Sequence, residues 1–110
     1  TMLSNRFDPL CVPFLRVLKQ IVDAGRKNHT PVTLCGELAG RPISAMALIG
    51  LGFRSISMAP AAIGPVKAML LDLPVAELAA QLDAAMNGDG AEADVRALLG
   101  EFAETRSIPL

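Results

Sequence analysis

Cys35 is the residue of this chain whose type and position most favour chemistry. It lies in HTPVTLCGELAG (29–40), where a short run of β-branched and apolar residues ends on the cysteine and a glycine follows at once. A thiol has a reference pKa of about 8.5, so at neutral pH it is mostly protonated and can act as a general acid. The alternative is a buried packing residue, which is a common role for an intracellular cysteine.

The other reactive side chains near this segment offer less. Glu37 is either a solvated loop charge or a group that orients a site, and Arg41 is either its ion-pair partner or simply exposed. We interpret Cys11 as structural and His29 as an exposed loop residue. One histidine and two cysteines, without a CxxC pair, cannot build a zinc-type cluster or a disulfide framework, so we expect no metal ligands in this chain.

Strands and helices alternate in the first part of the sequence. Pro31–Gly36 is short, β-branched and apolar, which predicts a buried strand of a parallel sheet, and Phe53–Met58 predicts a second strand. Ser57 and Met58 end that second strand, where each would either line a pocket or pack. Helices are expected over 13–25, 43–49, 63–71, 75–86 and 93–105. The last residues, SIPL, are expected to form a loose tail.

This order predicts an α/β fold. We expect the C-terminal portion of a (β/α)₈ TIM barrel, with about two parallel strands and flanking helices in residues 1–74, followed by a helical C-terminal appendage over 75–110. Two strands do not make a stable parallel sheet with both faces covered, so the chain looks like a piece of a larger domain. Barrel active sites lie at the carboxyl ends of the strands, and Cys35 ends a predicted strand.

Composition narrows the class of protein. The chain has 110 residues, a formal net charge of −1 and no Trp or Tyr, which disfavours nucleic-acid binding. No apolar run is long enough to cross a membrane, and the start TMLSNRFDPL does not read as a signal peptide, so we expect no membrane association. The two cysteines suit a reduced, cytoplasmic setting. The mean hydropathy of +0.44 suggests surface that is buried in an oligomer or by a larger protein.

Several segments together resemble one family. LCGELAG (34–40) is similar to the cysteine-bearing segment of the phosphoenolpyruvate-utilising enzymes, most closely the enzyme I type of phosphoenolpyruvate–protein phosphotransferases. RFDPLCVPFLRVLKQIVDAG (6–25) and ALIGLGFRSISMAPAAIGPVK (47–67) resemble the family's segments before and after it. RFDPL and PVTLCGELAG look most like the nitrogen-related version of enzyme I. The resemblance covers about residues 5–75 well and the tail loosely.

The resemblance implies a function. The family's C-terminal domain is a (β/α)₈ barrel that binds phosphoenolpyruvate and Mg²⁺ and forms a homodimer. The phosphoryl group passes to a histidine of a separate domain and then to a small, HPr-like phosphocarrier protein. The family's cysteine donates the proton that turns the enolate into pyruvate, and by position that cysteine is Cys35.

The arginines and acidic Mg²⁺ ligands that the family uses are expected before residue 1, so we predict that these 110 residues alone are inactive. Two alternatives stay open. The chain would otherwise belong to the pyruvate phosphate dikinase or phosphoenolpyruvate synthase branch, or act as a non-catalytic dimerisation module in which Cys35 is only packed.

Overall fold

The computed structural model describes residues 9–35, 37–87 and 94–110. Its elements are α2 (Val12–Lys27), β1 (Leu34–Cys35), a 3₁₀ helix (Glu37–Gly40), α3 (Pro42–Leu51), β2 (Ile56–Ser57), α4 (Pro60–Leu70), α5 (Val75–Asn87) and α6 (Val95–Thr105). The described part is therefore mostly helical, with one two-stranded parallel sheet, as expected of part of an α/β domain. None of the described helices is long and apolar enough to cross a membrane.

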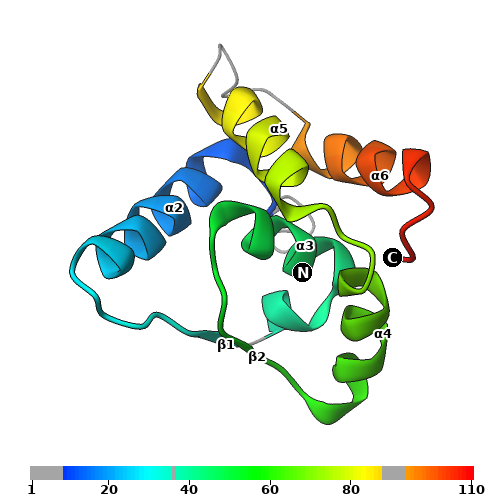
Figure 1. The fold of residues 1–110 in the computed structure, drawn as a ribbon, viewed down its shortest axis with the longest axis horizontal. Coiled ribbons are helices and arrows are strands. Elements are labelled where there is room, and N and C mark those ends of the chain that lie inside the picture. The colour runs from blue at the N-terminus through cyan, green and yellow to red at the C-terminus, as the bar shows by residue number, and fades with distance from the viewer. Residues whose placement is uncertain (1–8, 36, 88–93) are drawn as a thin grey trace, which may run out of the picture.

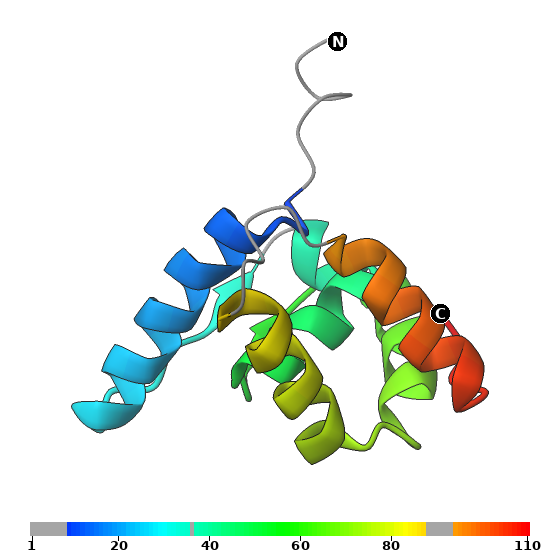
Figure 2. The same cartoon turned by 90° about the horizontal axis from the view of Figure 1, so that it is seen from above.

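Helix α3 lies at the centre of the structure. It packs against α2, α4, α5 and α6, and Figure 1 shows it surrounded by these helices and the sheet. Every residue from Ser44 to Leu51 is buried, so α3 has no polar face, as expected for a helix enclosed by the protein. Figure 2 shows α2 on one side of the molecule and α6 on the other, with α5 between them.

The outer helices are amphipathic and share one core with α3. Their buried stripes are Leu15, Leu18 and Val22 in α2, Leu78, Leu82 and Met86 in α5, and Val95, Leu99 and Phe102 in α6. Close approach of α5 depends on Gly50, because a Cβ there would lie 2.4 Å from Leu82 Cδ1. The expected barrel part and the expected appendage thus pack on the same core. The division of the chain at residue 74 stays a prediction.

All five predicted helices are present, with shifted ends. Helix α4 begins at Pro60 rather than residue 63, because proline fits the first helical position. Helix α2 continues through Gly25 to Lys27, so Gly25 does not end it. Glycine is needed here because Val32 packs against this position: a Cβ on Gly25 would lie 2.4 Å from Val32 Cγ2. Helix α6 starts at Val95, where the Asp94 carboxylate accepts the Ala97 N–H at 3.0 Å.

The strands are shorter and more exposed than predicted. β1 and β2 pair in parallel over two residues each, with Leu34 beside Ile56 and Cys35 beside Ser57. Leu34 and Ile56 are half-buried against the core, whereas Cys35 and Ser57 are exposed, so the expectation of a buried strand over Pro31–Gly36 is wrong. Phe53 does not pair; its N–H donates to the Leu48 carbonyl at 3.1 Å at the end of α3. In the described residues the sheet has no third strand to extend this pairing.

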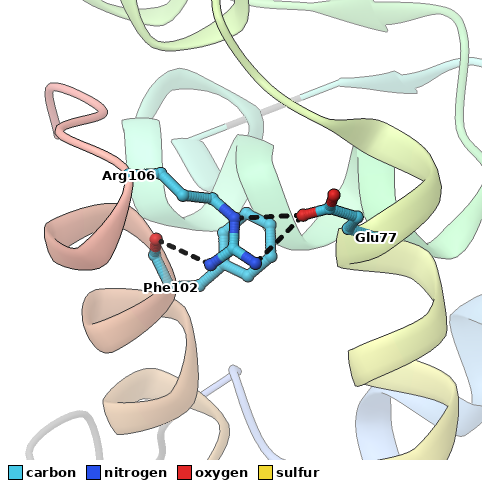
Figure 3. A network of polar contacts seen from close by, with 3 residues as sticks. All are labelled: Glu77, Phe102 and Arg106. Atoms are coloured by element: carbon cyan, nitrogen blue, oxygen red, sulfur yellow. Dashed lines mark hydrogen bonds and ion pairs between the residues drawn. The ribbon is translucent and has the colours of Figure 1, made fainter.

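The C-terminus is attached rather than loose. Arg106 Nε and Nη2 donate to Glu77 Oε2 of α5 at 3.2 and 3.0 Å, and the Arg106 guanidinium lies 3.8 Å from the centre of the Phe102 ring (Figure 3). Ile108 is 6% exposed, and its N–H donates to the Ala103 carbonyl at 2.8 Å. These contacts hold the chain as far as Ile108 against α5 and α6, whereas Pro109 and Leu110 are exposed.

Candidate active site

Cys35 is the last residue of β1, so it lies at the carboxyl end of a parallel strand. Its side chain is exposed and is a free thiol. Gly36 and the side chain of Glu37 lie outside the described part of the chain. The 3₁₀ helix that follows the strand spans Glu37–Gly40. The thiol is therefore accessible at the strand end. It is not packed in the core, as a purely structural cysteine would be.

The sheet face around Cys35 is lined with small polar side chains. Because side chains alternate along a strand, Thr33 lies on the same face as Cys35, and Ser55 on the same face as Ser57. The pairing of Cys35 with Ser57 joins these into one face, and the Thr33 and Ser55 hydroxyls are hydrogen-bonded at 2.8 Å. All four side chains are exposed. The opposite face carries Leu34 and Ile56, which pack on the core.

A cavity of about 410 Å³ adjoins this face on the β2 side. Thr33, Ser55 and Ser57 line it together with apolar residues of α4, and Cys35 is not among its lining residues. Lys67 of α4 also lines it and brings a positive charge near the Ser57 end of the sheet. Sequence reasoning did not single out Lys67. The signal was its spacing from Ile63, which puts both residues on one face of α4.

The remaining candidates lie elsewhere. His29 is exposed in the loop before β1, at φ 54°, and its N–H donates to the Arg26 carbonyl. Cys11 is half-buried at the N-terminal end of α2, where its carbonyl accepts the Leu15 N–H at 3.0 Å. Arg41 is exposed and directly precedes α3. The structure thus places Ser57 beside Cys35, but leaves His29 at the amino end of the strand that Cys35 ends.

The described residues offer no metal centre. No group of three or more His, Cys, Asp or Glu side chains comes together among them. The described carboxylates after β2 are all exposed: Asp72, Glu77, Asp83, Asp94, Glu101 and Glu104. Asp89 and Glu92 lie outside the described residues. No step through a metal ion can therefore be derived from these side chains.

Comparison with known proteins shows which family this chain resembles. Residues 1–75 match the family model of the PEP-binding domain of PEP-utilising enzymes. A phosphoenolpyruvate-protein phosphotransferase of Borreliella burgdorferi is 36% identical over 79% of this chain and 15% of its own length. A multiphosphoryl transfer protein of Xanthomonas campestris is 38% identical over 87% of the chain and 11% of its own length.

A third relative, an Escherichia coli protein named phosphoenolpyruvate-dependent phosphotransferase system, is 35% identical over 70% of the chain and 10% of its own length. The chain thus spans less than a fifth of the length of the curated relatives it matches. Both the family match and the identity to these relatives cover most of the chain, including Cys35 and both strands. The chain therefore belongs to the family of PEP-utilising enzymes, and residues 1–75 correspond to their PEP-binding domain.

Proposed function

We propose that this chain is part of a phosphoenolpyruvate–protein phosphotransferase and that Cys35 is the proton donor of its reaction. The observation that carries the proposal is the exposed Cys35 thiol at the carboxyl end of a parallel strand, within the segment that matches the PEP-binding domain. Relatives named as phosphoenolpyruvate-protein phosphotransferases support the reaction class.

The proposed step is a proton transfer to carbon. Cleavage of the P–O bond of phosphoenolpyruvate passes the phosphoryl group to a histidine of the longer protein and leaves the enolate of pyruvate. The Cys35 S–H bond then breaks, and its proton forms a C–H bond at the methylene carbon, which gives pyruvate and a thiolate. The thiolate regains its proton from solvent. A general acid positioned in this way contributes about 10²- to 10⁴-fold to the rate.

A (β/α)₈ barrel is the architecture we propose for the complete domain. In such a barrel one face of each strand packs on the surrounding helices and the other points to the interior. Leu34 and Ile56 pack on the helical core, so the polar face with Cys35 and Ser57 would be the interior one. Further strands beside β1 and β2 would cover that face and enclose a substrate next to the thiol.

The partners follow from the same proposal. Phosphoenolpyruvate is the substrate, and a small HPr-like phosphocarrier protein is the acceptor. A homodimer is supported by the mean hydropathy of +0.44. Mg²⁺ would be held outside the described residues, since these bring no suitable ligand group together. The nitrogen-related type of enzyme I is proposed on the RFDPL and PVTLCGELAG segments alone.

The reaction class can be tested in the longer protein that carries these residues. Incubation with phosphoenolpyruvate labelled in its phosphoryl group, without any nucleotide, should give labelled protein and an equal amount of pyruvate. The label should then move to a small phosphocarrier protein. An absolute requirement for an adenine nucleotide would instead indicate the dikinase or synthase branch and would overturn the proposal.

A further inference from the structure

Two adjoining cavities lie at the end of the sheet opposite Cys35. One, of about 360 Å³, lies between α2, the C-terminal end of α3, and α5; the other, of about 330 Å³, lies beside the loop before β1. Arg26, Gly52 and Arg54 line both cavities and so form the boundary between them. We call the two cavities together the cationic groove.

Positive charge dominates this groove. Lys19, Arg26 and Arg54 line it, against a single lining carboxylate, that of Asp83. Lys19 also contacts Asp23 at 3.3 Å, but both side chains are substantially exposed, so that contact is a screened surface ion pair. Like charges gathered around one concavity repel each other, and a bound anion would relieve that repulsion.

The two arginines are held in place by the end of α3. Arg26 Nη2 donates to the Gly52 carbonyl at 3.2 Å, and Arg54 Nη1 donates to the carbonyls of Ile49 and Phe53, each at 2.9 Å. These bonds offset the negative carbonyl end of the helix. Each guanidinium has five N–H donors, so both retain donors for a ligand after these bonds. The guanidinium group of arginine binds the oxygens of carboxylates and phosphates through pairs of parallel hydrogen bonds.

Gly52 keeps the boundary between the two cavities open. It is buried with φ 121°, and a Cβ at this position would lie 3.1 Å from Arg26 Nη2. A side chain there would therefore occupy the space beside the guanidinium. All lining residues of the groove belong to the described part of the chain. The smaller cavity reaches the amino ends of the strands at Val32 and Ser55, and Cys35 lines neither cavity.

We propose that the cationic groove is a second binding site, for a small multivalent anion that carries phosphate or carboxylate groups. Each cavity has a volume at the lower end of the range for small-molecule sites. Cys35 lines neither cavity, so this second site is separate from the proposed substrate site. The inference does not depend on the proposed reaction.

Titration of the ¹⁵N-labelled 110-residue chain followed by amide NMR tests this directly. Sodium phosphate and sodium citrate are added separately, at constant ionic strength, to distinguish phosphate-bearing from carboxylate-bearing ligands. Saturable shifts of the Gly50, Gly52 and Arg54 amides with either anion would support the site. The anion that saturates at the lower concentration identifies the ligand chemistry.

Variants separate a site from general charge screening. Arg54→Gln and Lys19→Gln should each weaken binding about tenfold, because each removes a charged hydrogen-bond donor. Lys27→Gln, an exposed cation of α2 outside both cavities, should leave binding unchanged. Lys19→Gln keeps the test valid if Arg54→Gln unfolds, since Lys19 does not bond to the end of α3. Non-saturable shifts with both anions, or equal weakening in Lys27→Gln, would overturn the proposal.

Discussion

Cys35 and Ser57 are direct partners across the parallel sheet, and both side chains are exposed on the same face. They come from the ends of two different strands, twenty-two positions apart in sequence. The hydrogen bond between Thr33 and Ser55 continues the same polar face one step toward the amino ends of the strands. A thiol among hydroxyl groups on an accessible sheet face is a suitable place for proton transfer, whereas a thiol in an apolar core is not.

Exposure of Cys35 predicts selective alkylation of the native chain. Cys35 should react with iodoacetamide well before Cys11, which is half-buried at the start of α2. Mass spectrometry of the digested protein would locate the label. The Cys11→Ser variant should keep the fast reaction and Cys35→Ser should lose it. Equal rates for the two cysteines would show that the thiol is not accessible at the strand end.

Gly52 is predicted to be intolerant of any side chain. Gly52→Ala should lower the free energy of unfolding by about 1–3 kcal/mol, because φ 121° is strained for a residue with a Cβ and Arg26 lies against that position. Gly100→Ala is the control, since a Cβ there meets nothing within 4 Å inside α6. The control should be neutral or gain about 0.5–1 kcal/mol. Urea denaturation measures both, and similar values for the two variants would be inconsistent with this account.

Close packing of α3 on α5 predicts coupling between Gly50 and Leu82. Gly50→Ala alone should cost about 1–3 kcal/mol, because the new methyl group overlaps Leu82 Cδ1 in a filled core. Leu82→Ala alone should cost about 2–5 kcal/mol through the cavity it leaves.

In the Leu82→Ala background the cost of Gly50→Ala should fall, since the 2.4 Å overlap with Leu82 Cδ1 is gone; the tight approach to Leu78 Cγ at 3.0 Å remains. A double-mutant cycle from urea denaturation gives the coupling. Additive effects would mean that α5 does not pack against Gly50.

The contacts of Arg106 predict unequal effects for its two partners. Glu77→Gln should cost less than about 1 kcal/mol, and less still in high salt, because the Glu77 side chain is 63% exposed. Arg106→Ala should cost more, since it also removes the cation–π contact with Phe102, worth about 0.5–1 kcal/mol. Thermal unfolding at low and high salt measures both variants. A larger, salt-independent effect of Glu77→Gln would contradict the assignment of a surface ion pair.

The helices could be predicted from the sequence because each has a local signal. Leu78, Leu82 and Met86 repeat at helical spacing, and Pro42 stands where it can only begin a helix. The length of the strands could not be predicted, because strand pairing depends on neighbours rather than on the strand's own residues. Pro31–Gly36 has a strand composition, yet only Leu34 and Cys35 pair.

Features of the sites that combine residues from separate elements could not be predicted from the sequence either. Cys35 could be singled out because it ends a β-branched run before a glycine. The resemblance of its segment to the family then predicted that it acts as a proton donor. Lys67 and the cationic groove carried no comparable signal. Lys19 and Arg26 lie on α2 and Arg54 lies in the loop before β2, and only the packing of α2 and α5 around α3 brings them to one cavity.

The central claim is that Cys35 donates the proton that completes pyruvate. The most direct test is the rate of pyruvate formation from phosphoenolpyruvate in the longer protein, with Cys35→Ala compared with Cys11→Ala and circular dichroism confirming that each variant is folded. We predict that Cys35→Ala lowers this rate by about 10²- to 10⁴-fold while Cys11→Ala leaves it unchanged. A folded Cys35→Ala variant that forms pyruvate at the wild-type rate would contradict the claim.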